Sequence, residues 1–381
     1  MVGQDVRTLP TSADVVVIGA GQAGLSAGFH LLRRGFVPAT SAAAGGTTPT
    51  FVVLDAEDGP GGAWRHRWRS LRMATVNDIY DLPGIEQPAV DPEAASADVL
   101  PAYFADYERE LGLGVARPVR VRSVRWDDDG EHLLVATDAG DAVRARAVVN
   151  ATGTWSKPFW PAYPGQETFL GRQLHTADYV RAEDFAGLRV GIVGGGISAL
   201  QLMEEISHVG TTTWFTRREP VWVDGHFTPQ AGHDAVARVE ERVRAGLPPL
   251  SVVAATGLIR TPYVRSLEAR GLLVRHPMFA RIMPDGVVEA DGTRTPLDVL
   301  FWNTGFRAAL DHLRPLHLRE PGGGIRMDGT QVAGEPRVHL IGYGPSSSTV
   351  GANRAGRDAV NALVRTLGVA APTVQSAPTG G

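Results

Sequence analysis

Two stretches of the chain share one pattern of apolar and polar positions. Residues 14–35 (DVVVIGAGQAGLSAGFHLLRRG) and 189–210 (RVGIVGGGISALQLMEEISHVG) each open with a short β-branched run, pass through glycines and end with apolar residues at helical spacing. Each stretch therefore predicts a strand, a tight turn and a helix. Two such units about 175 residues apart favour two nucleotide-binding domains over an array of short repeats.

The rest of the pattern predicts how these units are connected. Residues 38–50 are small and polar and predict a surface loop, whereas the Pro-rich run 157–165 and the run ending at Phe306 predict crossovers between domains. We expect an α/β fold with two Rossmann-like domains of three layers (ββα), one inserted in the other. Further strands are predicted over FVVLDAE (51–57), HLLVATD (132–138), AVVNATG (147–153) and HLIGYG (339–344), and a last helix over GANRAGRDAVNALVRTL (351–367), beginning near Ser347.

The composition narrows the chemistry. The chain has 381 residues, of which 43% are apolar and 20% charged, and this balance excludes wholesale disorder. A net charge of −4 argues against nucleic-acid binding, which needs a basic surface. The chain has no cysteine, and none of its 11 histidines stands at metal-ligand spacing, so we expect neither thiol chemistry nor a metal site. Redox chemistry would have to come from a bound cofactor.

No targeting pattern is visible at the N-terminus. The most hydrophobic run, residues 15–32, contains four glycines together with Gln22, Ser26 and His30, so it does not predict a membrane span. We therefore expect a cytoplasmic protein. A homodimer is one possible oligomeric state. Residues 370–381 are expected to form a disordered tail.

The first glycine turn has the spacing of a dinucleotide-binding motif. In Gly19-Ala-Gly21-Gln22-Ala23-Gly24 the first glycine permits the turn, the second lets a pyrophosphate approach the backbone, and the third lets the helix pack on the strand. An acid that binds the ribose is expected about 20 residues further on. Asp55 ends the next strand 31 residues after Gly24, and removing the loop at 38–50 restores the usual spacing. The alternative is a plain glycine-rich turn.

The second glycine turn is the GxGxxA variant, Gly194-Gly-Gly196-Ile-Ser198-Ala199. The strand after it is followed by Arg217 and Arg218 and not by an acid, and arginines can bind the 2′-phosphate of NADP in a fork of hydrogen bonds. The alternative is a pair of solvated arginines. Two sites of opposite ribose preference are most simply explained by FAD in the first and NADPH in the second, with a hydride passed between them.

Three further motifs resemble the flavin-containing monooxygenases, the class B flavoprotein monooxygenases that include the plant YUCCA type. They are Gly61-Gly62-Ala-Trp64, the fingerprint Phe169-x-Gly171-xxx-His175-xxx-Tyr179, and the crossover tripeptides Ala151-Thr-Gly153 and Asn303-Thr-Gly305. The resemblance covers about residues 14–367. The Tyr179-Val180 ending of the fingerprint is similar to the branch that oxygenates nitrogen or sulfur, because the Baeyer–Villiger branch usually has Trp followed by Pro or Asp.

The resemblance also implies roles for individual residues. Gly62 and Trp64 would contact FAD, and the segment from Trp68 to Asn77 would line the flavin edge, with Arg72 and Thr75 at the cofactor. Asn77 is the candidate catalytic residue, since an asparagine often lies over the reactive face of the flavin in this family. The basic cluster at 65–72 would serve the cofactor phosphates or form a solvated loop. His175 would order the connection between domains.

The resemblance implies the following activity. NADPH reduces FAD, O2 adds to give a C4a-peroxyflavin, and that intermediate oxygenates a small soft nucleophile at nitrogen or sulfur, or less readily a carbonyl. A rival is a reductase that passes electrons to a protein or quinone, and a third option is a redox sensor that binds both cofactors. Residues 224–282 match nothing in the family, and we expect them to shape the substrate entrance.

The expected domain organisation follows from these assignments. Residues 1–160 form the first part of the FAD-binding domain, residues 161–303 the NADPH-binding domain, and residues 304–369 the return segment of the FAD-binding domain.

Overall fold

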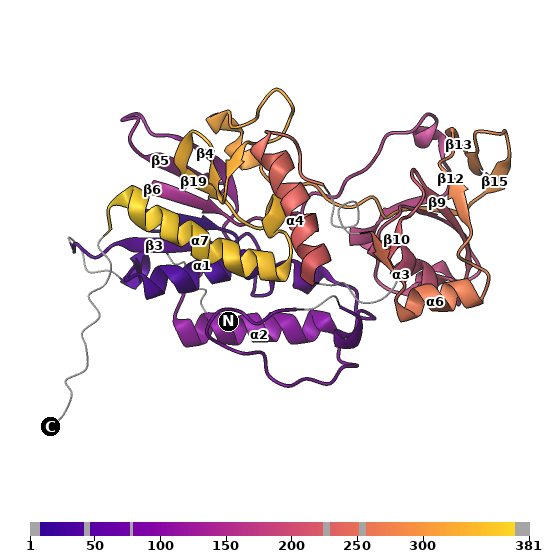
Figure 1. The fold of residues 1–381 in the computed structure, drawn as a ribbon, viewed down its shortest axis with the longest axis horizontal. Coiled ribbons are helices and arrows are strands. Elements are labelled where there is room, and N and C mark those ends of the chain that lie inside the picture. Colours follow the sequence, from indigo (N-terminus) through magenta and orange to yellow (C-terminus); the bar gives the residue numbers. More distant parts are fainter. Residues whose placement is uncertain (1–7, 42–45, 77–78, 224–228, 251–256, 370–381) are drawn as a thin grey trace.

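The chain folds into two α/β lobes, each built on its own sheet (Figure 1). A computed structural model describes residues 8–41, 46–76, 79–223, 229–250 and 257–369. The first lobe contains strands from both ends of the chain and the second contains strands from the middle, so the second lobe is inserted in the first, as predicted.

The first lobe is built on a nine-stranded sheet of order β17-β18-β19-β6-β1-β3-β2, and β5 and β4 extend from β6. The central strands β19, β6, β1 and β3 run parallel. The strands are β1 (Ser12–Ile18), β2 (Val37–Pro38), β3 (Thr50–Leu54), β4 (Val121–Trp126), β5 (Leu133–Thr137), β6 (Ala142–Asn150), β17 (Met327–Asp328), β18 (Gln331–Val332) and β19 (Glu335–Leu340).

The β-branched run of β1 is explained by burial on both faces of this sheet. Val15 and Val17 pack in one hydrophobic cluster with the helices, and Val16 and Ile18 pack in another with strands β4 and β5. The helices of this lobe are α1 (Gln22–Arg33), α2 (Ser96–Leu111) and α7 (Thr349–Leu367). Helices α1 and α7 lie side by side on one face (Figure 1).

The second lobe is built on a five-stranded parallel sheet of order β12-β9-β8-β16-β7. Helices α3 (Ile197–Ile206) and α6 (Pro262–Ala269) accompany it, and α3 packs the apolar positions that the sequence pattern indicated. The strands are β7 (Arg172–His175), β8 (Arg189–Val193), β9 (Thr211–Thr216), β12 (Arg275–Pro277) and β16 (Val299–Trp302), with small pairings between β10 (Trp222–Val223) and β11 (Leu258–Ile259) and among β13 (Arg281–Met283), β14 (Gly286–Val288) and β15 (Arg294–Pro296).

Two connections link the sheets of the two lobes, one after β6 ends at Asn150 and one after β16 ends at Trp302. The predicted boundaries at 160 and 303 fall in these connections and stay predictions. The loop predicted at 38–50 is entered through β2, because Val37 pairs with Thr50 of β3; residues 42–45 lie outside the described residues.

Short 3₁₀ helices complete the fold: η1 (Ala39–Ser41), η2 (Gly62–His66), η3 (Met73–Thr75), η4 (Gln166–Thr168), η5 (Thr176–Asp178), η6 (Ala182–Phe185), η7 (Asp311–Leu316) and η8 (Gly344–Ser346).

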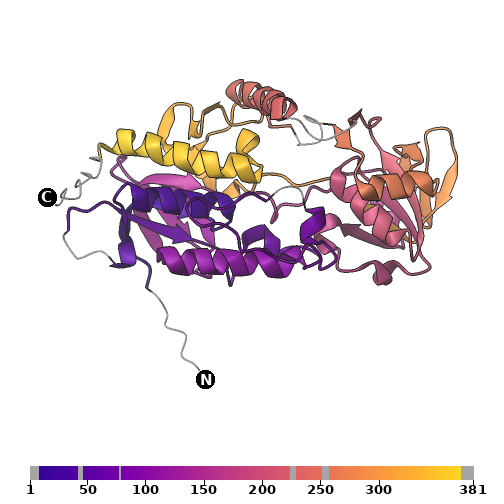
Figure 2. The same cartoon turned by 60° about the horizontal axis from the view of Figure 1, so that its bottom comes forward.

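Helix α4 (Pro229–Arg244) belongs to the second lobe in sequence but packs on the first (Figure 2). Val243 is buried in the hydrophobic cluster of the first lobe that contains Leu310 and Tyr343. A Cβ at Gly344 would lie 3.1 Å from a methyl group of Val243, so η8, next to the start of α7, lies directly under the helix. No described helix is both long enough and apolar enough to cross a membrane.

Candidate cofactor-binding site

The first glycine turn combines two tightly packed glycines with one that faces open space. Gly19 has a φ of 99°, and a Cβ there would lie 2.6 Å from the carbonyl oxygen of Ala151. A Cβ at Gly24 would overlap the carbonyl oxygen of Gly19. Around Gly21, the N-cap of α1, no atom of the described residues lies within 4 Å of the Cβ position. The backbone N–H groups at the start of α1 therefore face a space that a phosphate can enter.

The second glycine turn is built in the same way. Gly194 has a φ of 146°, and a Cβ there would overlap the carbonyl oxygen of Asn303. Nothing in the described structure lies within 4 Å of the Cβ position of Gly196, the N-cap of α3, and Ala199 is fully buried at the third position. Ser198 lies in the first turn of α3. Both turns thus fit the diphosphate of a dinucleotide, one on each sheet.

Asp55 lies at the carboxyl end of β3 as predicted, but its carboxylate is already engaged. Oδ2 accepts a hydrogen bond of 2.9 Å from Nε of Arg117, and Arg117 also donates two bonds to Glu108 of α2. Burial alone would lower the pKa of Arg117, but the hydrogen bonds and charges of Glu108 and Asp55 raise it above its ordinary value. The sequence analysis missed Arg117, because nothing local indicates that it reaches a residue 62 positions away.

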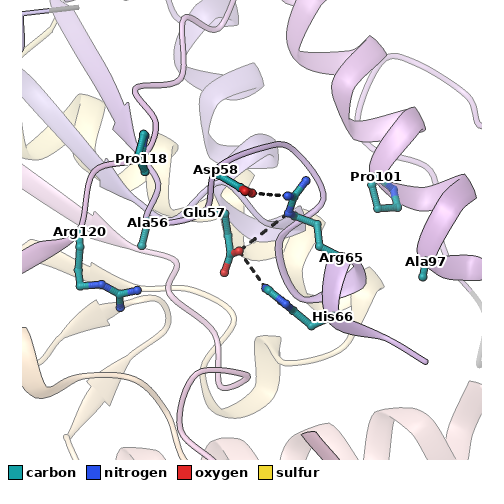
Figure 3. Close-up of a pocket in the computed structure, with 9 residues that line it drawn as sticks. All are labelled: Ala56, Glu57, Asp58, Arg65, His66, Ala97, Pro101, Pro118 and Arg120. Atoms are coloured by element: carbon teal, nitrogen blue, oxygen red, sulfur yellow. Dashed lines mark hydrogen bonds and ion pairs between the residues drawn. The ribbon is translucent and has the colours of Figure 1, made fainter. Parts of the chain in front are cut away.

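A hollow of about 620 Å³ opens beside Ala56, the residue that follows Asp55 in the chain (Figure 3). One wall carries paired charges: Glu57 contacts His66 at 2.9 Å, and Asp58 pairs with Arg65. The hollow follows the carboxyl end of β3, where the adenosine end of a dinucleotide bound at Gly21 would lie. The lining residues are Ala56, Glu57, Asp58, Arg65, His66, Ala97, Pro101, Pro118 and Arg120.

The end of β9 in the second lobe is basic. Arg217 and Arg218 are exposed there, and neither is within ion-pair distance of a carboxylate in the described part of the chain. Arg275 of the neighbouring strand β12 donates from Nε to Oγ1 of Thr216 at 2.7 Å, and Thr216 in turn donates to the carbonyl of Arg218 at 2.8 Å. Arg275 was missed by the sequence analysis, since only the pairing of β12 with β9 brings it to this edge.

The segment after Gly62 joins the first turn to the second lobe. A Cβ at Gly62 would lie 3.0 Å from Cα of Gly21, so the segment abuts the first turn, and Trp64 packs against the hydrophobic clusters of both lobes. Arg72 and Thr75 are exposed: Arg72 donates to the carbonyl of Glu93 at 3.1 Å and Thr75 to that of Arg72 at 3.1 Å. Asn77, the predicted catalytic residue, lies outside the described residues.

The fingerprint residue Tyr179 binds the two lobes together. Its ring packs edge-to-face against Trp68 of the first lobe, with centroids 5.8 Å apart. Its hydroxyl donates to Glu205 of α3 at 2.8 Å, and the same carboxylate oxygen accepts a bond of 2.6 Å from Ser70. Trp68 and Leu71 are buried in the core of the second lobe.

His175 orders the second connection, as the resemblance implied. Its Nε2 lies 3.0 Å from the carbonyl of Gly305, and its Nδ1 accepts a bond of 3.2 Å from the backbone of Ala177. Burial lowers the pKa of His175 below its ordinary value, so the ring is neutral and donates from Nε2. Both ring nitrogens of His175 are therefore engaged in hydrogen bonds with the backbone.

The start of α7 lies beside the start of α1. Ser348 caps α7 by accepting a bond of 3.1 Å from the backbone of Gly351. Gln22, the first residue of α1, contacts Asn353 of α7 at 3.4 Å and donates to the carbonyl of Tyr80 at 3.1 Å. Two helix N-termini, each with partial positive charge, therefore converge at one edge of the first sheet.

Two nucleotide cradles on two joined Rossmann-like lobes define the class of two-dinucleotide-binding oxidoreductases. A model of the pyridine nucleotide-disulphide oxidoreductase family matches residues 13–343. The chain therefore belongs to this family, and within it to the flavin monooxygenases of class B. The chain has no cysteine, so the dithiol chemistry in the family's name is not available to it.

Comparisons with individual proteins agree. The solved flavin-containing monooxygenase from Stenotrophomonas maltophilia is 38% identical with a TM-score of 0.77, and the match covers 94% of this chain and 100% of that one. An indole-3-pyruvate monooxygenase of the YUCCA type from Oryza sativa subsp. japonica is 31% identical over 209 residues, which is 55% of this chain and 48% of the relative. A Baeyer–Villiger monooxygenase from Streptomyces coelicolor is 29% identical over 55% of this chain and 38% of its own length.

The chain thus spans half or less of the length of these curated relatives. Cyclohexanone monooxygenase, 20% identical with a TM-score of 0.63, shares the fold. Membership of the family implies FAD and NADP(H) as cofactors, and the two cradles fit them.

Proposed function

We propose that the chain is an NADPH-dependent flavin monooxygenase with FAD in the first lobe and NADPH in the second. The observation that carries the proposal is the matched pair of glycine turns, in which Gly21 and Gly196 alone face open space. The strand ends differ as the two cofactors require, with Asp55 at one and Arg217 and Arg218 at the other.

Named residues would hold each cofactor. The backbone of Gly21, Gln22 and Ala23 would bind the FAD diphosphate, Asp55 the ribose, and the hollow beside it the adenosine end. The backbone of Gly196 and the first turn of α3 with Ser198 would bind the NADPH diphosphate, and Arg217 and Arg218 the 2′-phosphate. When bound, the flavin accepts a hydride from the nicotinamide and supplies the oxygen chemistry.

The chain's own task is to position these groups and exclude water. Trp155 of the first connection and Phe306 of the second stack with centroids 4.9 Å apart, so aromatic rings close the junction between the lobes. The N-terminus of α7 would present partial positive charge to the reduced flavin.

We infer nitrogen or sulfur as the oxygenated atom. The support is the Tyr179-Val180 ending of the fingerprint, which resembles the branch that oxygenates nitrogen or sulfur. The relatives include both YUCCA-type and Baeyer–Villiger enzymes, so the choice between the two chemistries rests on this motif. Substrates are expected to be small molecules with O2 as the co-substrate. We further propose that the protein is cytoplasmic and can form a homodimer. We also propose that Asn77 is the catalytic residue and that the domain boundaries lie at residues 160 and 303.

The test measures how many NADPH molecules are consumed per molecule of oxygenated product. The purified protein should carry FAD, oxidise NADPH in preference to NADH, and consume one NADPH per oxygenated product on a panel of amines, sulfides and ketones. If ketones were the only substrates, the oxygenated group would be a carbonyl and not nitrogen or sulfur. NADPH oxidation that passes electrons to an added quinone in the absence of O2, with no oxygenated product from the panel, would instead establish the reductase.

A further inference from the structure

Arg67 is a cation held between three tryptophans. Its guanidinium carbon lies 4.4 Å from the ring centre of Trp155, 5.4 Å from that of Trp64 and 6.0 Å from that of Trp68. Its Nε is fully buried and has no hydrogen-bond partner in the part of the chain that the structure describes. Across the described residues, no carboxylate lies within 4.0 Å of its nitrogens.

The neighbouring basic residues show the contrast. Arg65 pairs with Asp58, His66 with Glu57, and Arg69 with Asp98 at 2.5 Å. Arg67 is the member of this run that is desolvated and has no counter-charge in the described structure. Burial lowers the pKa of Arg67 to about 10, well below its ordinary value, so the side chain is still charged at neutral pH.

A buried charge without a partner is costly, and cation–π contacts offset only part of that cost. If Arg67 served packing alone, an apolar side chain of similar length would fill the tryptophan cage without the desolvation penalty. A guanidinium in this position is therefore explained by an anion that arrives with a ligand.

The surroundings indicate which anion. Gly62, five residues before Arg67, abuts Gly21 of the first cradle. Trp68, the next residue, packs in the cluster that contains α3, whose N-terminus is the second cradle. Trp155 lies in the connection between the lobes. Arg67 thus belongs to the segment that runs from the first cradle to the core of the second lobe, and its planar fork suits phosphate oxygens.

We propose that Arg67 binds a diphosphate oxygen of a bound dinucleotide and thereby couples cofactor binding to the junction between the lobes. This inference rests on the proposed function, because it requires that the two cradles hold dinucleotides. The diphosphate belongs either to FAD or to NADP(H), and the experiment below separates the two.

The test compares Arg67→Met, which keeps the length, Arg67→Lys, which keeps the charge without the fork, and Arg109→Met as the control, since Arg109 is exposed on α2 and pairs with Asp106 at 2.7 Å. Dissociation constants are measured for FAD with the apoprotein and for NADP⁺ with the FAD-loaded protein, by calorimetry and by tryptophan fluorescence. Thermal unfolding is followed with and without each dinucleotide.

Arg67→Met should weaken one of the two dinucleotides by about tenfold to a hundredfold, as expected for loss of a hydrogen bond to a charged group. Arg67→Lys should lose less, and Arg109→Met should bind as the wild type does. Weakened FAD alone assigns the bond to FAD, and weakened NADP⁺ alone assigns it to NADP(H).

Two results would overturn the proposal. One is a lower melting temperature of Arg67→Met with unchanged dissociation constants for both dinucleotides, which would show a packing role. The other is a raised KM for the organic substrate alone, which would place a substrate group there. A wild-type protein that binds neither dinucleotide would refute the proposed function itself.

Discussion

The two glycines of the first turn should respond to substitution in opposite ways. The backbone at Gly21 has φ −77° and ψ −173°, which any residue adopts, and none of the described residues places an atom within 4 Å of its Cβ position. Gly21→Val should therefore change the free energy of unfolding of the apoprotein by no more than about 1 kcal/mol. The new side chain would occupy the space that the FAD diphosphate needs.

The loss in affinity can be worked from the bonds removed. A hydrogen bond to a charged group contributes about 1.5–3 kcal/mol, so displacing two from the helix N-terminus costs at least about 3 kcal/mol, or roughly a hundredfold in the dissociation constant. Gly24→Ala is the counterpart: its Cβ would overlap the Gly19 carbonyl, and overpacking of this kind should destabilise the fold by about 3 kcal/mol.

The assay measures both quantities on the same samples. Urea unfolding of the apoproteins gives stability, and absorbance after incubation with FAD gives bound flavin per chain. Stoichiometric FAD in Gly21→Val, or wild-type stability in Gly24→Ala, would refute the assignment of open space to one glycine and packing to the other.

Three further outcomes are expected. Arg217→Ala should raise KM for NADPH about tenfold or more and leave NADH almost unchanged; equal losses would contradict the 2′-phosphate assignment. Burial lowers the pKa values of His312 and His339 from 6.5 to about 4. As the pH falls, these histidines are therefore protonated in the unfolded chain before they are protonated in the folded one. The free energy of unfolding should be at its full value above pH 6.5 and should fall by roughly 3 kcal/mol per histidine down to pH 4. Denaturant midpoints that stay flat between pH 7 and 5 would argue against this. Tyr179→Phe removes the bond to Glu205 and should lower the free energy of unfolding by about 1.5 kcal/mol, measured by urea unfolding of the FAD-loaded protein; an unchanged midpoint would show that the bond contributes nothing.

Local requirements explain what the sequence predicted. The strand–turn–helix units were found because each needs its glycines within six residues, and Asp55 was found because it ends a buried strand. The insertion of one lobe in the other followed from the order of the two units. All these features are set by neighbours in the chain.

Contacts between distant residues explain what the sequence did not predict. Arg117 reaches Asp55, and Arg275 reaches Thr216, only after the sheets have formed. Arg67 stood in a recognised basic cluster, but the sequence could not show that no carboxylate of the described residues pairs with it while its neighbours have such partners. The apolar positions of α4 indicate an amphipathic helix without indicating which lobe it covers.

Helix α4 makes the inserted lobe less self-contained than its sheet suggests. Val243 fills part of the first lobe's interior, so an excised fragment covering residues 161–303 would carry that apolar side chain into water with nothing to receive it. Attempts to graft this half onto a relative would have to transplant its docking partners as well, among them Tyr343 and Leu310. The two halves behave as interlocked parts and not as interchangeable modules.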